Sequence, residues 1–212
     1  MKTEMLKIDP ELLEADKIHR IADVLRRDGT IAYPTETFYG LGAAAFSSKA
    51  VRKIYRLKRR VRGKPLPVVV SDLQMAKDIV TEIPPFFSAL AQDFWPGPLT
   101  LVVRASSVLP RDLLGRDGTI GLRLPSPAWL RELVRQLACP LTATSANVSG
   151  EREISDPREV IRLFYGKVNL VVDGGLTPGA MPSTVVDLSR GKAEILREGA
   201  IPRSILKKYL EM

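Results

Sequence analysis

Positively charged residues are concentrated in one short stretch of the chain. Residues 52–65, RKIYRLKRRVRGKP, contain eight lysines and arginines and no acidic residue. The whole chain has 32 Lys and Arg against 24 Asp and Glu, so the remainder is electrically balanced. A local concentration of cations indicates a site for anions. Either the phosphates of a small substrate or the backbone of a nucleic acid would suit it.

Hydroxyl and amide side chains follow the expected strand at 140–146, in TATSANVSG, and recur in PSTVVDL. Ser145, Asn147 and Ser183 belong to these segments. Taken alone, such clusters are more often capped turns than active sites. At the end of a strand they can also hold phosphate or carboxylate oxygens through neutral hydrogen bonds.

Two arginines are set within apolar segments that we expect to be strands. They are Arg123 in GLRLP and Arg197 in ILREG. A buried, unpaired guanidinium is costly, so each needs an anionic partner. A structural ion pair would be a sufficient explanation for either arginine alone. Two such arginines, together with the cation-rich segment and the two hydroxyl-rich segments, favour a shared site for an anion. Glu36, in PTET, either assists a substrate or Mg²⁺ or pairs with an arginine.

Several common kinds of site are excluded or disfavoured. YGLGAAA has the G-x-G-x-x-A spacing, but its first glycine lies several residues beyond the expected strand, and arginines occupy the place of the ribose-binding acid. RGKP is not a Walker A motif. With one cysteine, Cys139, and one histidine, His19, there is no internal disulfide and no His/Cys metal cluster. No apolar run approaches about 18 residues, so we expect a cytoplasmic protein without a membrane span.

The order of elements predicts a layered α/β domain, because expected strands alternate with expected helices. A helix is expected at 48–57, capped by Ser47 or Ser48, with Val51, Ile54 and Tyr55 on its inner face. The other expected helices cover 10–28, 72–80, 86–94, 127–138, 157–165 and the residues from 202. The expected strands cover 30–35, 66–71, 99–105, 119–125, 140–146, 169–174, 183–188 and 193–198.

These segments together resemble the YrdC-type threonylcarbamoyl-AMP synthase family. YPTETFYGLG, a Lys-x-Arg in LKRRVRGKPL, FWPGPLTLV, GLRLP, TSANVSG, PSTVVDL and ILREGAI occur in the family's order and approximate spacing. The resemblance covers roughly residues 20–203, and implies that 1–212 form one domain of the short family form without a second C-terminal domain. The implied fold is an open, twisted, mixed sheet flanked by helices, with a positively charged concave cleft.

The resemblance also implies an activity and a set of site residues. Members of this family convert L-threonine, bicarbonate and ATP into threonylcarbamoyl-AMP and pyrophosphate, and a separate transferase passes the group to a tRNA adenosine next to the anticodon. Mg²⁺ is the expected helper. Motif position places Thr37, Arg123 and Ser183 around threonine. It places Lys58, Arg60, Lys64, Thr119, Ser145, Asn147 and Arg197 around ATP, with Lys58 and Arg60 as the catalytic cations.

The sequence departs from the family pattern at two places. The family commonly reads Lys-Gly-Arg-Pro where this chain has Lys58-Arg59-Arg60-Val61, and commonly has a histidine where Val69 aligns. Any step that uses that imidazole in the family would have to proceed here without it.

Two alternatives remain open. One is a module that binds tRNA or double-stranded RNA without catalysis, through Arg52, Lys53, Arg56 and Arg59 on the outer helix face. The other is a relative that forms carbamoyl-adenylate, which threonine dependence would distinguish.

Overall fold

The computed structural model describes residues 2–61, 63–179 and 181–210. Its strands form two mixed sheets rather than the single open sheet that the resemblance implied, while the α/β class is confirmed. Arg62, one of the eight cations in 52–65, lies outside the described residues.

The first sheet has the order β1-β9-β2-β3-β8, and the second has the order β11-β10-β5-β6-β4-β7. In the first, the pairs β1-β9 and β9-β2 are parallel, whereas β2-β3 and β3-β8 are antiparallel. In the second, β10-β5 and β4-β6 are parallel and the other pairs antiparallel. The first sheet consists of β1 (Glu4–Lys7), β2 (Ile31–Tyr33), β3 (Gly40–Gly42), β8 (Thr144–Ser145) and β9 (Leu170–Asp173). The second consists of β4 (Val68–Val69), β5 (Leu99–Arg104), β6 (Thr119–Arg123), β7 (Leu141–Thr142), β10 (Thr184–Asp187) and β11 (Glu194–Arg197).

The chain crosses from one sheet to the other at Ala143. The sequence predicts one strand over 140–146, but the structure divides it into β7, where Thr142 pairs with Val68, and β8, where Ser145 pairs with Gly40. The Ala143 amide donates to Pro67 O at 2.8 Å between them. The hydroxyl-rich segment is therefore anchored to both sheets.

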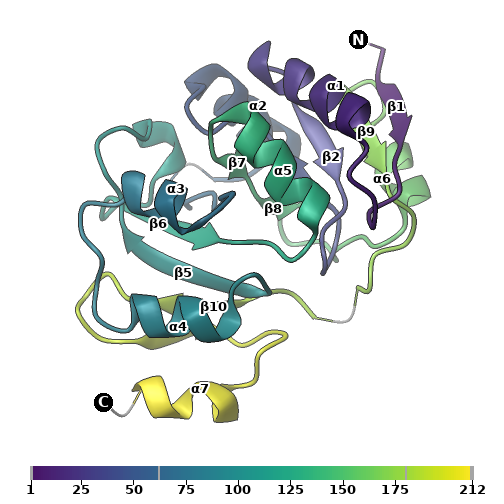
Figure 1. The fold of residues 1–212 in the computed structure, drawn as a ribbon. Coiled ribbons are helices and arrows are strands. Elements are labelled where there is room, and N and C mark those ends of the chain that lie inside the picture. Colours follow the sequence, from purple (N-terminus) through teal and green to yellow (C-terminus); the bar gives the residue numbers. More distant parts are fainter. Residues whose placement is uncertain (1, 62, 180, 211–212) are drawn as a thin grey trace.

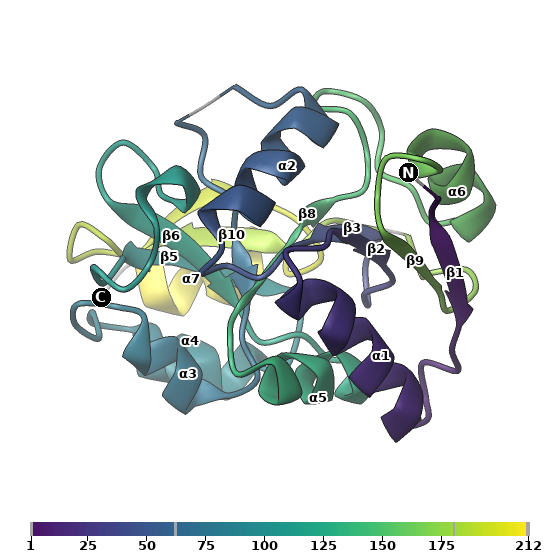
Figure 2. The same cartoon turned by 90° about the horizontal axis from the view of Figure 1, so that it is seen from above.

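Helices cover both sides of the sheets. α1 and α5 pack side by side, and Figure 2 shows α2 on the opposite side of the sheets from α3, α4 and α5. Figure 1 shows α4 and α7 next to the second sheet and α6 beside β1 and β9. The helices are α1 (Ala15–Arg26), α2 (Ser48–Lys58), α3 (Leu73–Asp78), α4 (Phe87–Phe94), α5 (Ala128–Leu137), α6 (Pro157–Phe164) and α7 (Arg203–Leu210), with a 3₁₀ turn at Arg111–Leu113.

The cap of α2 is as predicted, whereas the start of α1 is not. Ser47 Oγ accepts a hydrogen bond from the Ala50 amide at 3.1 Å and begins α2. α1 begins at Ala15 instead of Pro10, because Asp9 is used in a local turn: its Oδ1 accepts from the Glu11 amide and its amide donates to Glu14. The helix thus loses five residues that the Asp-Pro pair predicted.

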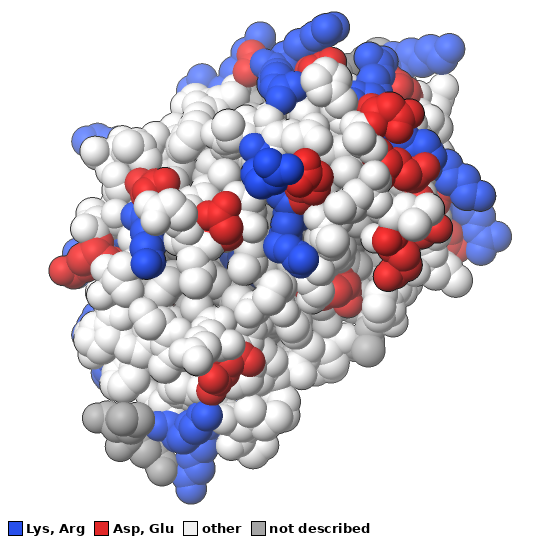
Figure 3. Space-filling model, viewed as in Figure 1, with Lys and Arg blue, Asp and Glu red and all other residues white. Residues whose placement is uncertain are grey.

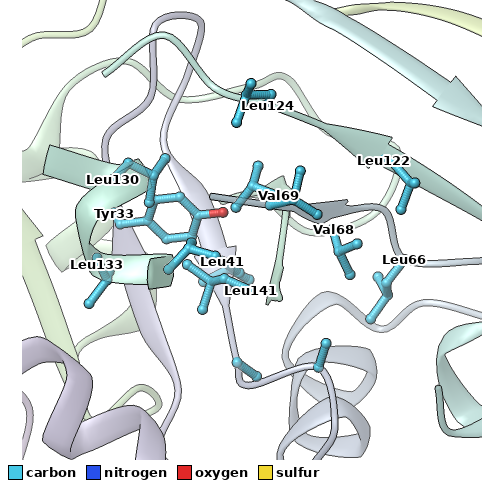
Figure 4. Packing of buried hydrophobic residues seen from close by; sticks show 14 of the residues in the cluster. Tyr33, Leu41, Leu66, Val68, Val69, Leu122, Leu124, Leu130, Leu133 and Leu141 are labelled. Atoms are coloured by element: carbon cyan, nitrogen blue, oxygen red, sulfur yellow. The ribbon is translucent and has the colours of Figure 1, made fainter. Parts of the chain in front are cut away.

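β3, with the sequence Gly-Leu-Gly, was not among the expected strands. Glycine is needed there for close packing: a Cβ on Gly42 would lie 2.8 Å from Cε1 of Tyr33. The Tyr33 hydroxyl donates to Thr142 O at 3.0 Å, which joins the first sheet to β7. Figure 4 shows the Tyr33 ring in the apolar core beside Leu130, with its hydroxyl end toward Val69. The aromatic ring therefore fills the space that the glycines leave.

Replacing Thr184 with valine should test the buried turn that follows β11. The Thr184 hydroxyl donates to Ile201 O at 2.7 Å and accepts from the amides of Gly199 and Ile201, both at 3.0 Å. Thr184→Val leaves these groups without their partner, and we expect the free energy of unfolding to fall by about 2–4 kcal/mol. Urea unfolding measures this change, and Thr81→Val at an exposed position serves as the control. Equal stability of the two variants would contradict the assignment.

Candidate active site

A cavity of about 330 Å³ opens between the two sheets. Its walls come from the loop after β2, the residues after α2, the strands β5, β6, β8, β10 and β11, and the segment after β8. Six of the residues predicted from the sequence line it: Thr37, Arg60, Arg123, Ser145, Ser183 and Arg197. Tertiary structure thus brings together side chains that lie up to 160 positions apart in the chain.

Arg123 is buried at the end of β6, and Glu36 is its partner. Arg123 Nη2 lies 2.6 Å from Glu36 Oε1, and Arg123 Nε donates to Gly97 O at 3.2 Å. The amide and hydroxyl of Ser126 also donate to Glu36 Oε1. Of the two roles left open for Glu36, the structure shows the pairing with an arginine. A guanidinium has five N–H donors, so Arg123 retains donors for a second anion in the cavity.

Arg197 and Ser183 are held together in the cavity lining. Arg197 donates twice to Ser183 O, at 3.1 and 2.8 Å, and its Nη2 donates to Ser183 Oγ at 3.1 Å. Ser183 Oγ also lies 3.0 Å from Thr100 Oγ1. Burial lowers the pKa of Arg197. Arg197 as a whole is nevertheless exposed, unlike the buried guanidinium expected from the sequence, and neutral oxygens rather than an acidic partner hold it where an arriving anion can reach it.

Thr37 belongs to a small cluster of hydroxyls in the loop after β2. Its Oγ1 lies 3.0 Å from Oγ1 of Thr35, which donates to Phe38 O at 2.7 Å. The carbonyl of Thr37 accepts from the Gly179 amide at 2.8 Å, which attaches the segment before β10 to this loop. Thr35 also lines the cavity, and its proximity to Thr37 in PTET was a sequence signal that went unused.

Lys58 does not line the cavity; it supports the loop that does. Its Nζ donates to Ser145 O at 2.5 Å, to Asn147 O at 2.9 Å and to Asn147 Oδ1 at 2.7 Å, and the side chain is 1% exposed. An ammonium has three donors, so all are engaged. Ser145 Oγ donates to the same Asn147 Oδ1 at 2.7 Å. Direct binding of ATP by Lys58 and Asn147 stays a prediction, because in this arrangement they position Ser145.

Arg60 faces the cavity from the segment after α2. Arg59, with a φ of 50°, ends the helix in the left-handed conformation and turns the chain. Arg60 Nε and Nη2 then donate to Lys64 O at 3.3 Å and Pro65 O at 3.0 Å, which directs the guanidinium inward. Burial lowers the pKa of Arg60.

Lys64 and Thr119 lie outside the cavity lining. Lys64 is exposed, and its carbonyl rather than its ammonium contacts Arg60. Thr119 begins β6, and Arg123, four residues further along that strand, lines the cavity; this spacing places Thr119 about 13 Å away. A contact of either residue with the nucleotide stays a prediction. Val69, where the family commonly has a histidine, forms part of the apolar wall.

Glu153 is a cavity residue that the sequence analysis missed. Nothing in its local sequence distinguishes it from the other acidic residues, of which the chain has 24 with the aspartates included. It lies eight residues beyond Ser145, in the segment between β8 and α6, and its charge acts on both Lys58 and Arg197. Only the fold reveals its position.

The outer cations of α2 lie on the surface beside this cavity. Arg52, Arg56 and Arg59 are exposed and line a shallow hollow with Lys49, whereas Lys53 turns toward α1 and donates to Asp28 O at 2.8 Å. Arg52 also lies 3.2 Å from Asp112 and borders a hollow with Arg111 and Arg116. On the face shown in Figure 3, by contrast, basic and acidic side chains are interspersed. Within the described residues, no helix is long and apolar enough to span a bilayer.

The buried ammonium of Lys58 should make the free energy of unfolding depend on pH. Burial and the nearby charge of Arg60 lower the pKa of Lys58 to about 8, from 10.5. Between these values the unfolded chain binds more protons than the native state, so the free energy of unfolding rises with pH. We expect the native chain to gain about 1–2 kcal/mol from pH 7 to 9.5 relative to Lys58→Met.

Denaturant unfolding at several pH values measures this difference. The exposed Lys77→Met variant is the control and should follow the native chain. Parallel pH profiles for the native chain and Lys58→Met would refute the assignment.

Comparison with known proteins identifies the family to which this chain is similar. The Sua5/YciO/YrdC family model, described as telomere recombination, matches residues 23–199. A protein of Pyrococcus abyssi named threonylcarbamoyl-AMP synthase is 36% identical over 200 residues, or 94% of this chain and 59% of that protein. One of the same name from Thiobacillus denitrificans is 38% identical over 168 residues, or 79% of this chain and 89% of that protein.

The crystal structure of P. abyssi Sua5 complexed with L-threonine superposes with a TM-score of 0.93 at 36% identity, and covers 98% of this chain and 61% of that one. The chain thus spans about three fifths of the length of its P. abyssi relative. The match of the family model, the two curated relatives and the shared fold lead to one conclusion: the chain belongs to the Sua5/YciO/YrdC family.

Proposed function

We propose that the chain is a threonylcarbamoyl-AMP synthase, which joins L-threonine, bicarbonate and ATP into threonylcarbamoyl-AMP with release of pyrophosphate. The observation that carries the proposal is the convergence of Arg60, Arg123 and Arg197 on one cavity, with Ser145 and Ser183 between them. The names of the two curated relatives support it. In this proposal a separate transferase consumes the adenylate to modify tRNA.

Threonine is assigned to the end of the cavity formed by Thr37, Arg123 and Ser183. Arg123 can bind the substrate carboxylate through the N–H groups that are not engaged by Glu36 or Gly97 O. Glu36 keeps the guanidinium oriented. Because the Thr35 hydroxyl donates to Phe38 O, Thr37 donates to Thr35, and the Thr37 oxygen remains as an acceptor for a polar group of the substrate. The P. abyssi relative was crystallised with L-threonine, which supports threonine as the ligand.

The triphosphate is assigned to Arg60, Ser145 and Arg197. The threonine amine attacks bicarbonate to give a carbamate and water, and a carbamate oxygen then attacks the α-phosphorus of ATP while pyrophosphate leaves. Carbamate and triphosphate are both anions, so their approach requires cations on the cavity wall. Lys58 acts through Asn147 and Ser145, whose positions it fixes. Magnesium, when bound to ATP, supplies further neutralisation of the leaving pyrophosphate.

The chemistry needs no histidine in this proposal. Val69 forms an apolar wall where the family commonly has an imidazole. Transfer to phosphorus depends chiefly on positioning and on electrostatic stabilisation. The arginines and hydroxyls of the cavity supply both.

An RNA-binding role at the outer face of α2 is the second candidate. Arg52, Arg56 and Arg59 are exposed on neighbouring turns, and Lys49 lies beside them. Cations spaced along one face are suited to the phosphate backbone of tRNA or double-stranded RNA. Lys53 is omitted from this surface because it is only partly exposed and donates to Asp28 O. The two roles are compatible, since none of the outer cations lines the cavity, although Arg60 borders both the cavity and their hollow.

Release of pyrophosphate from ATP should require both L-threonine and bicarbonate. We expect Arg197→Gln to reduce the rate by about 100-fold or more, because it removes a charge at the developing anion. Arg203→Gln, at an exposed position, should retain the native rate. The assay is coupled pyrophosphate detection together with mass spectrometry of the adenylate. Release that is independent of threonine would instead favour a carbamoyl-adenylate-forming relative.

Removal of Arg52, Arg56 and Arg59 should weaken RNA binding without abolishing the synthase activity. A triple alanine variant should bind tRNA with lower affinity, and the slope of log K against log salt should fall by about 2–3, because each arginine that neutralises a phosphate adds about one unit to that slope. Fluorescence anisotropy at several salt concentrations measures both quantities. An unchanged affinity and slope in the variant would argue against this surface.

A further inference from the structure

Glu153 stands out because it is an acid in a cavity that otherwise presents cations. Among the described residues that line the cavity it is the one acidic side chain, and it is half-buried there. The proposed substrates bicarbonate and ATP are anions, and a carboxylate repels both. Its presence therefore needs a compensating role.

The surroundings of Glu153 place it at the nucleotide end of the cavity. Its charge acts on Lys58, which supports Ser145, and on Arg197. Arg197 belongs to the group assigned to the triphosphate, and Lys58 positions Ser145 of that group. In the described part of the chain, no hydrogen bond or ion pair within 4 Å holds its carboxylate. Glu36, by contrast, is fixed by Arg123 and Ser126.

We propose that the Glu153 carboxylate binds the divalent cation that accompanies ATP and so joins it to the cavity wall. The inference rests on the proposed synthase function. Mg²⁺ in nucleotide sites is commonly held by one or two carboxylates together with phosphate oxygens and water. A single free carboxylate beside phosphate-binding cations fits that pattern.

The described residues alone do not supply enough ligands to coordinate such a cation. Within the described residues, no group of three or more His, Cys, Asp or Glu is placed to hold a metal ion. The phosphates must therefore supply most of the ligands, and the metal and the nucleotide should bind together. This predicts a strong thermodynamic coupling between Mg²⁺ and ATP.

A purely electrostatic role of Glu153 predicts the opposite result. A carboxylate that only offsets the charges of Arg197 and Lys58 weakens the binding of ATP, with or without a metal. Its removal would then strengthen binding under both conditions. A carboxylate that holds the metal strengthens the binding of MgATP and weakens that of free ATP. Removing it should therefore change the two affinities in opposite directions.

The test is isothermal titration with ATP, in Mg²⁺ and in EDTA, without threonine so that no product forms. In the native chain Mg²⁺ should raise the affinity by about tenfold or more, and in Glu153→Gln this gain should fall to about twofold or less. In EDTA, Glu153→Gln should bind ATP more tightly than the native chain. Glu151→Gln makes the same change of charge at an exposed position two residues away and should behave as the native chain.

Glu153→Asp separates the metal contact from the charge. It keeps the carboxylate but withdraws it by one methylene, so the Mg²⁺-dependent gain should fall while the affinity in EDTA stays native. Electron paramagnetic resonance of Mn²⁺ gives a second readout: the native chain with ATP should immobilise Mn²⁺ more than Glu153→Gln does. Circular dichroism confirms that each variant folds.

The proposal is overturned if Glu153→Gln binds MgATP as tightly as, or more tightly than, the native chain. A native chain that binds ATP equally well in Mg²⁺ and EDTA also overturns it, while threonine-dependent release of pyrophosphate would leave the synthase function intact. A native chain that binds no ATP under either condition overturns the synthase function and this inference together.

Discussion

The site depends on the buried ammonium of Lys58. It is located at the end of α2 and donates its three hydrogen bonds to Ser145 and Asn147, which lie 87 and 89 residues further along the chain. The Lys58 carbonyl accepts from the Ser149 amide at 2.9 Å, so one residue fixes both sides of the loop. A buried charge without a carboxylate in direct contact is costly, and the oriented carbonyls offset that cost only if the loop keeps this shape. The position of Ser145 in the cavity therefore depends on the hydrogen bonds of Lys58.

Both sheets contribute residues to the cavity. The first sheet contributes the loop with Thr37 and the strand with Ser145, and the second contributes Arg123 from β6 and Arg197 from β11. Crossing at Ala143 holds the sheets in a fixed relation. Each cavity arginine donates to fixed oxygens, so the cations are oriented before a substrate arrives. Such preorganisation is the main source of electrostatic stabilisation in catalysis.

Most elements could be predicted from local patterns, because their periodicity and caps are encoded within a few residues. α2 is an example, with Ser47 as its cap and alternating inner and outer faces. The start of α1 was wrong for a local reason, the turn made by Asp9, whereas the errors in the strands have long-range causes. β3 resembles a loop until Tyr33 packs over its glycines, and one predicted strand became β7 and β8 because each half found its partner in a different sheet. Pairing partners far apart in sequence leave no local signal.

For the site, the sequence by itself determined which residue types were available. The dense cations of 52–65, the arginines within apolar strands and the hydroxyl-rich segments all pointed to an anion, and six of the predicted residues line one cavity. Tertiary structure decided their roles. It turned Lys58 into a support for the loop, left Lys64 and Thr119 outside the cavity lining, paired Glu36 with Arg123, and placed Glu153 among the cations. The reason is physical: sequence fixes the charge of a side chain, whereas its neighbours and its burial, which only folding sets, determine what that charge can bind.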